Sequence, residues 1–93
     1  MQAACLPWLR ERDVAVVGAD TGNDVFPLQY SSIGGPVHAV GIGAIGLWIL
    51  DNPDYEELSE TCARLNRWEF QVVIAPLKLA NGTGSPVNPL AMF

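Results

Sequence analysis

This 93-residue chain has few basic residues, and they do not cluster. Five Lys and Arg residues stand against ten Asp and Glu residues, so the formal net charge is −5 at pH 7. Proteins that bind nucleic acids place a patch of positive charge against the phosphates, and anionic membrane surfaces attract the same kind of patch. The sequence therefore predicts neither a nucleic-acid-binding protein nor a protein that binds membranes.

Long apolar runs are also missing. The longest, residues 37–50, contains His38 and three glycines, whereas a helix that spans a bilayer needs about 20 mostly apolar residues. The first residues lack the basic start and apolar stretch of a secretory signal peptide. We therefore expect a cytoplasmic protein.

Cysteine is scarce, with only Cys5 and Cys62 present. The two are far apart and have neither CxxC nor zinc-ribbon spacing, so we expect buried or partly buried reduced thiols. No local pattern supports either cysteine as a nucleophile paired with His38. No serine lies in the G-x-S-x-G sequence that marks a nucleophile elbow.

Charged residues make up 16% of the chain and hydrophobic residues 49%. Free-standing domains average about 25% charged residues. Because 93 residues suffice for one small core, we expect residues 1–93 to form a single domain. The low charge predicts that this domain hides part of its surface, either against another subunit or against a missing part of its own fold.

Alternating helical and extended patterns predict a mixed α/β domain. Residues 3–12 resemble the end of a helix, and residues 14–18 are a continuous apolar run, typical of a strand buried on both faces. Pro36 suits the first turn of a helix over residues 37–47. A short strand is expected at residues 48–50.

The second half predicts one helix and two extended segments. Glu56 and Glu57 open the helix, as its macrodipole favours, and Leu58, Cys62 and Leu65 form one narrow inward face. Residues 70–79 are rich in β-branched side chains and contain Pro76, which favours an edge strand or a bulge. Residues 87–93 predict a last extended segment.

Residues 41–46 match the G-x-G-x-x-G pattern of dinucleotide-binding loops. Such a loop needs a preceding strand, a long helix after it and an acidic residue about 20 positions further on. Asn66 occupies that last position, and residues 51–53 end any helix early. We therefore assign no cofactor-binding residues and interpret the glycines as allowing close helix packing. Dinucleotide binding stays a hypothesis that measured NAD binding would test.

His38 is the only histidine. Taken alone, it is typical of a hydrogen-bonded core or interface residue, because a catalytic zinc normally takes three protein ligands. A metal site would need carboxylates such as Asp20, Asp24 or Asp51, or ligands from another chain. Asp20 follows the first strand, where α/β folds place functional groups, although the same position also suits a plain turn.

Four stretches, in order, resemble the cyclase family of metal-dependent hydrolases, which includes bacterial kynurenine formamidases. Together they cover nearly the whole chain: LPWLRERDVAVVGADTGND, PVHAVGIGAIGLWILDN, DYEELSETCARLNRWEFQVVIAPLKL and GTGSPVNPLAMF. The resemblance implies an α/β fold of the swivelling β/β/α type. For this chain it implies a partial domain, the carboxyl-terminal half, with a mixed sheet and two to three helices.

The resemblance also implies chemistry. Family members hydrolyse amides or related acyl bonds, such as that of N-formylkynurenine in tryptophan catabolism, with zinc or manganese, and they assemble into dimers or tetramers. His38 matches a metal-ligand histidine of the family, and Asp51 lies near the position of a ligand glutamate. The family's His-x-Gly-Thr-His-x-Asp motif is missing here.

We therefore expect His38 and Asp51 to be metal residues that bind a divalent metal weakly in this chain alone. No catalytic residue is assigned, and we expect little or no hydrolase activity without a complementing amino-terminal half. The alternative is a non-catalytic α/β interaction module that forms homo- or hetero-oligomers.

Overall fold

The computed structural model describes residues 1–93. The chain folds into two compact units, Met1–Asp54 and Tyr55–Phe93. The expectation of a single domain over residues 1–93 stays a prediction. No helix has the length and apolar character needed to cross a membrane.

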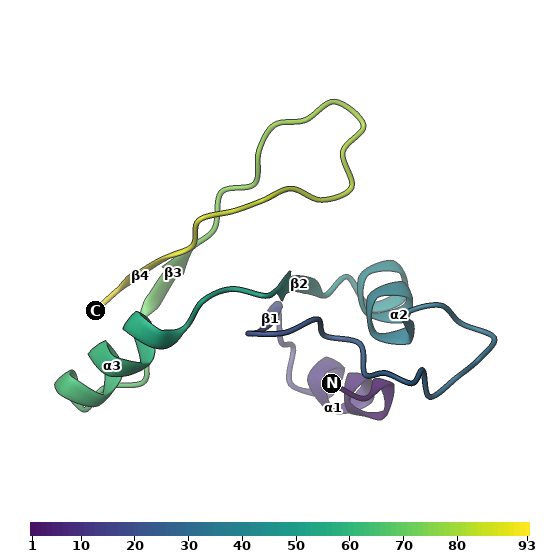
Figure 1. Ribbon diagram of the computed structural model, residues 1–93, viewed down its shortest axis with the longest axis horizontal. Coiled ribbons are helices and arrows are strands. Elements are labelled where there is room, and N and C mark those ends of the chain that lie inside the picture. The colour runs from purple at the N-terminus through teal and green to yellow at the C-terminus, as the bar shows by residue number, and fades with distance from the viewer. The chain divides into compact units, whose positions relative to one another are not determined.

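The first unit consists of helices packed against a pair of parallel strands (Figure 1). Its elements are a 3-10 turn at Ala3–Cys5, α1 at Leu6–Glu11, β1 at Val16–Ala19, α2 at Pro36–Ile45 and β2 at Trp48–Asp51. In the parallel pair, Val17 lies opposite Ile49, and Ala19 lies opposite Asp51. Because the strands are parallel, their carboxyl ends meet at one edge of the sheet.

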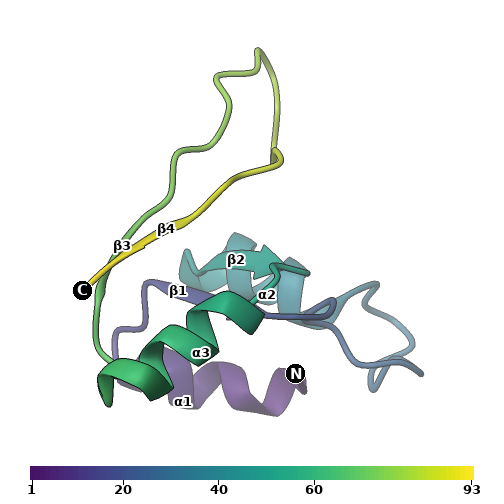
Figure 2. The same cartoon turned by 60° about the vertical axis from the view of Figure 1, so that its left-hand side comes forward.

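A small apolar core packs α1 and α2 against these strands. β1 and β2 lie side by side in Figure 2. Its buried residues are each at most 7% exposed: Leu6, Leu9, Val37 and Leu47. Val17 and Ile49 pack against this cluster from the inward face of the strands. The core thus holds the first turn of α2 close to the carboxyl edge of the sheet.

Glycine defines both ends of α2. Gly35 precedes the helix with φ of 59°, and Gly46 follows it with φ of 69°. Both values lie in the left-handed region, which glycine adopts without the steric cost of a Cβ. Pro36 opens the helix, as predicted.

The G-x-G-x-x-G sequence therefore lies within a helix and at its end. Close packing is confirmed for Gly41, where a Cβ would lie 3.5 Å from side-chain atoms of Leu6 and Ile49. The same interpretation is wrong for Gly43 and Gly46, because a Cβ at either position would meet nothing within 4 Å.

The second unit contains α3, Glu56–Leu65, followed by an antiparallel hairpin of β3, Gln71–Val73, and β4, Leu90–Met92. Val72 lies opposite Ala91, and the rings of Phe70 and Phe93 are 5.3 Å apart between centroids. Residues 74–89 form a long loop that extends from the two strands in both ribbon views.

The predicted mixture of parallel and antiparallel pairing is present, but in two separate two-stranded sheets. The strand expected at residues 70–79 ends at Val73, and Pro76 beyond it has no N–H with which to extend the ladder. The burial expected for β1 on both faces is wrong, since Gly18 is exposed.

Two burial predictions also need correction. Leu65, the last residue of α3, is 45% exposed, and Cys62 is the buried residue of that helix. Cys5 is exposed in the 3-10 turn, whereas Cys62 is buried, and both thiols are free. The next residue, Leu6, is buried in the core.

Candidate functional site

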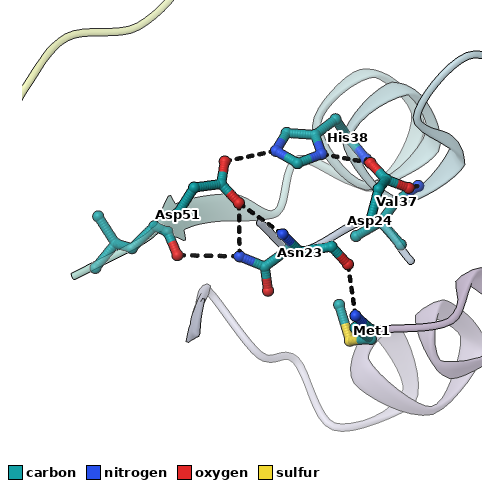
Figure 3. Close-up of polar contacts among 7 residues, drawn as sticks. Met1, Asn23, Asp24, Val37, His38 and Asp51 are labelled. Atoms are coloured by element: carbon teal, nitrogen blue, oxygen red, sulfur yellow. Dashed lines mark hydrogen bonds and ion pairs between the residues drawn. The ribbon is translucent and has the colours of Figure 1, made fainter. Parts of the chain in front are cut away.

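A polar cluster forms at the carboxyl edge of the β1–β2 sheet (Figure 3). His38 comes from the first turn of α2, and Asp51 is the last residue of β2. Asn23 and Asp24 belong to the irregular segment that follows β1. The cluster is therefore built from one helix, one strand end and one loop.

His38 lies between two carboxylates. Its Nδ1 is 2.5 Å from Asp24 Oδ2, and its Nε2 is 2.6 Å from Asp51 Oδ2. The His38 side chain is 36% exposed. The ring is thus held at both nitrogens while one face of the site stays open to solvent.

Asp24 also caps α2. Its Oδ1 accepts a hydrogen bond from the Val37 N–H at 2.7 Å, and its Oδ2 accepts one from the His38 N–H at 3.2 Å. These backbone donors have no partner inside the helix, and a carboxylate at this end is also favoured by the helix dipole. The Asp24 side chain is 7% exposed, and its carboxylate binds the first turn of α2 and the imidazole.

Asn23 performs a similar role for Asp51. Its backbone N–H and its side-chain amide both donate to Asp51 Oδ1, at 2.8 and 2.9 Å. The amide also donates to the Leu50 carbonyl at 3.0 Å, and the Asn23 carbonyl accepts from the amino group of Met1 at 2.7 Å. Asn23 is 1% exposed, and these bonds satisfy its buried polar atoms.

The network shifts the pKa values of its members. Hydrogen bonds that the protonated ring donates to Asp24 first and then to Asp51 raise the pKa of His38 above its ordinary value. For both carboxyls burial works toward a higher pKa, but the hydrogen bonds that they accept, first from His38, lower the pKa overall. The favoured charge state is therefore an imidazolium between two carboxylates.

This charge state predicts a pH dependence of stability in the metal-free chain. Because folding raises the pKa of His38, its contribution is complete below about pH 6.5 and is lost as pH rises through the higher folded pKa. The carboxyls contribute above about pH 3.9, and their contribution is lost as pH falls below it.

Urea unfolding from pH 4.5 to 9 in the presence of a chelator would measure this effect. The free energy of unfolding is expected to fall toward the alkaline end, and His38→Gln should flatten that fall. An equal alkaline decline in the His38→Gln protein would contradict the prediction.

The donor set fits part of a divalent metal site. Imidazole nitrogen and carboxylate oxygen are ligands that zinc takes in proteins. His38 Nε2 and Asp51 Oδ2 lie 2.6 Å apart, but no three His, Cys, Asp or Glu side chains gather in a metal-binding arrangement. Asp24 lies on the other side of the ring and is already bonded there. The chain thus offers two candidate ligands of a set that needs at least one more.

Of the residues singled out in the sequence, the structure brings together His38, Asp24 and Asp51. Asp20 is exposed and is not among the partners of His38. Sequence reasoning gave no role to Asn23. The only signal for Asn23 and Asp24 was their place just beyond a strand in an α/β pattern, where polar groups collect.

Nucleophilic catalysis finds no support in the geometry. Both nitrogens of His38 contact carboxylates, so the hypothetical pairing of the imidazole with a cysteine is wrong. The Ser59 hydroxyl donates to the Glu56 carbonyl, and Ser85 Oγ accepts from the Leu77 N–H. These two hydroxyls serve local backbone structure.

A separate hollow of about 410 Å³ lies in the first unit between α1, the loop before α2, and α2 itself. Its lining is almost entirely apolar, with Leu6, Ile33 and Val40 among the contributors and Arg10 as the only charged residue. None of the polar side chains around His38 lines it, so the hollow is distinct from the candidate site.

Comparison with known proteins supports a cyclase-type fold. A crystal structure described as that of a novel cyclase matches 96% of this chain, with a TM-score of 0.76 and 31% sequence identity. The match covers 28% of that protein, so the present chain spans little more than a quarter of its length. No protein-family profile and no curated protein sequence matches the chain.

The fold class predicted from the sequence is thereby confirmed. The chain has the α/β fold of part of a cyclase, with three α-helices and small parallel and antiparallel sheets.

Proposed function

We propose that this chain is the carboxyl-terminal part of a metal-dependent amidohydrolase of the cyclase family. The observation that carries the proposal is the convergence of His38 Nε2 and Asp51 Oδ2, 2.6 Å apart at the carboxyl edge of a parallel strand pair. The structural similarity to a cyclase over nearly the whole chain supports the family assignment.

In this proposal His38 and Asp51 bind one divalent cation, zinc or manganese. Such an ion lowers the pKa of bound water toward neutrality and polarises a substrate carbonyl. The two residues contribute an imidazole nitrogen and a carboxylate oxygen from rigid elements, a helix terminus and a strand end. In the metal-free chain a hydrogen bond joins the same two atoms, so a cation would replace a proton between them.

The proposed site is incomplete without further ligands. A catalytic zinc site normally takes three protein ligands, and this chain supplies two. We therefore expect weak metal binding and little or no hydrolysis by the chain alone. The remaining ligands and the general acid or base would come from a complementing polypeptide with the family's histidine-rich motif.

The proposed substrate class is aryl formamides, with N-formylkynurenine as the first to test. The sequence stretches that resemble the cyclase family, which includes kynurenine formamidases, support this choice. An amide carbonyl is also the group that a metal of this kind polarises.

A complementation assay tests the proposal. The full chain would be mixed or co-expressed with the amino-terminal part of a cyclase that carries the missing motif, in zinc or manganese, with N-formylkynurenine as substrate. Hydrolysis is expected only from the pair. His38→Ala should lower the rate of the pair by at least about 100-fold, more than the loss of an outer-shell partner usually costs.

Asp20→Asn is the matched control, because it removes one exposed carboxylate from the same loop without touching His38. The proposal fails if the pair has no metal-dependent activity, or if His38→Ala behaves like Asp20→Asn. Metal-dependent hydrolysis by the chain alone would refute the expectation that the site is incomplete.

One observation favours a second function, a non-catalytic module that assembles with another copy. Every residue of β3 and β4 is exposed, and Val72, Leu90 and Met92 are 47, 56 and 46% exposed. An isolated two-stranded hairpin is marginally stable in water, so pairing of this hairpin with the same hairpin of a second copy would stabilise both.

Light scattering after size exclusion tests this second function. The wild type should be a metal-independent dimer, and Val72→Lys should convert it to a monomer. A monomeric wild type would rule out this function.

A further inference from the structure

We propose that the consecutive residues Asn23 and Asp24 are positioning residues that aim Asp51 Oδ2 and His38 Nε2 at one shared point. Each does so by binding the opposite atom of its partner: Asn23 holds Asp51 Oδ1, and Asp24 holds His38 Nδ1. That the shared point receives a cation rests on the proposed function. The positioning itself is a property of the metal-free chain.

The Asp24 half of the arrangement controls which ring nitrogen is free. A metal-binding histidine usually donates its other N–H to a carboxylate or carbonyl, which fixes both the tautomer and the orientation of the ring. Asp24 Oδ2 is 2.5 Å from Nδ1, and this carboxylate is only 7% exposed, whereas that of Asp51 is 33% exposed. Because the buried carboxylate is less screened by water, the proton of neutral His38 should reside on Nδ1. Nε2 then presents its lone pair outward.

The Asn23 half controls which carboxylate oxygen is free. Two donors of Asn23, the backbone N–H and the side-chain amide, converge on Asp51 Oδ1, at 2.8 and 2.9 Å. The third bond, from the amide to the Leu50 carbonyl, ties the same side chain to β2. Oδ1 is thus saturated, and only Oδ2 points toward the imidazole.

The two halves come from adjacent residues, as Figure 3 shows: Asn23 lies beside Asp51, and Asp24 lies beside His38. One short segment after β1 therefore orients side chains from β2 and from α2 at once. A shift of this segment would misalign both candidate ligands together.

A purely structural role is the competing explanation, because Asp24 also caps α2. Asp24→Asn changes the contact with the imidazole and keeps the shorter of the two cap bonds, because only the bond from the His38 N–H to Oδ2, at 3.2 Å, is lost with that oxygen. The asparagine keeps an oxygen for the Val37 N–H but places an amide, a donor, against Nδ1. The imidazole must then accept at Nδ1, which moves the ring proton to Nε2, the atom meant to face the cation.

The test is nitrogen NMR of the His38 ring in the full, metal-free chain with a chelator, at a pH where the ring is neutral. The wild type should show mainly the Nδ1–H tautomer, and Asp24→Asn should show mainly Nε2–H. Asp20→Asn, the matched removal of an exposed carboxylate, should resemble the wild type. A wild-type ring protonated on Nε2, or an unchanged tautomer in Asp24→Asn, would overturn the Asp24 half of the proposal.

The Asn23 half is tested at the Asp51 carboxyl. Asn23→Ser keeps the backbone donor and replaces the amide by a smaller hydroxyl, so backbone amide spectra of β1 and β2 should show that the sheet is retained. The carbon resonance of the Asp51 carboxyl should move, while the His38 tautomer stays that of the wild type. If Asn23→Ser unfolds the chain, Asn23→Asp, which keeps the size but loses the side-chain donor, gives the same readout. An unmoved Asp51 resonance in a folded variant refutes this half.

Titration with Zn²⁺ alone links the positioning to the proposed function. In the wild type the His38 Nε2 and Asp51 carboxyl resonances should shift together, and either positioning variant should weaken the apparent affinity by about 10-fold or more. Equal affinities in wild type and variants would count against the proposal. If Zn²⁺ shifts neither resonance in the wild type while the tautomer results hold, the positioning stands and the proposed function fails.

Discussion

Replacing Leu47 by alanine should lower the free energy of unfolding of the first unit by about 3 kcal/mol, because Leu→Ala in a packed core costs about 2–5 kcal/mol. Leu47 is 2% exposed and packs with Leu6, Leu9 and Val37 in the only cluster of buried apolar residues. The first unit has only four residues in this buried cluster, so the loss of one is a large part of its stability. We therefore expect a large fraction of the first unit to be unfolded at 25 °C.

Urea unfolding followed by circular dichroism, with hydrogen exchange at the β1 and β2 amides, would measure this loss. Ile42→Ala is the control: Ile42 lies in α2, is 53% exposed, and should change the stability by no more than about 0.5 kcal/mol. Similar stabilities for the two variants would mean that the cluster around Leu47 does not stabilise the unit.

The second large effect is expected at Gly35. Its φ of 59° is in the left-handed region, and a Cβ at this position would lie 3.0 Å from Asp24 Oδ2. Gly35→Ala should therefore cost about 1–2 kcal/mol of backbone strain and also push the Asp24 carboxylate away from His38. The ring should lose its fixed tautomer, and the pKa of His38 should move back toward its ordinary value.

Gly34→Ala provides a matched control one residue away, because a Cβ there meets nothing within 4 Å and its φ is not in the left-handed region. Thermal unfolding and a proton NMR titration of His38 would compare the two variants. If His38 has the same pKa in the Gly34→Ala and Gly35→Ala variants, the close approach of Asp24 to the backbone at Gly35 does not determine the position of the imidazole.

The regular elements of the first unit were predictable because their signals are local. Pro36 marks the start of α2, whereas the predicted end at residue 47 lies two residues too far, because the helix ends at Ile45 before Gly46. The extended pattern at residues 48–50 matches β2 to within one residue. β1 begins two residues later and ends one residue later than predicted, since a continuous apolar run does not show which of its members pair.

The second unit shows where local signals fail. β-branched residues between positions 70 and 79 favour a strand, but a strand needs a partner along its whole length, and β4 supplies only three residues. Leu65 has the right spacing for burial on α3, yet burial depends on a neighbouring surface that the spacing does not specify.

The candidate site was only half predictable for the same reason. His38 and Asp51 were singled out through resemblance to a family, but the acid that binds Nδ1 could not be chosen between Asp20 and Asp24. The choice depends on the path of an irregular loop that brings Asp24 to α2, and no periodicity encodes that path. The role of Asn23 could not be predicted because its hydrogen-bond partners, Asp51 and Leu50, lie 28 and 27 positions further along the chain.

The contact between the amino group of Met1 and the Asn23 carbonyl has a practical consequence. A purification tag fused ahead of Met1 would turn the charged ammonium group into a neutral amide next to Asn23, the residue that orients Asp51. Affinity tags for any of these measurements therefore belong after Phe93. Comparing tags at the two ends would also show how far a disturbance at the first residue travels into the polar cluster.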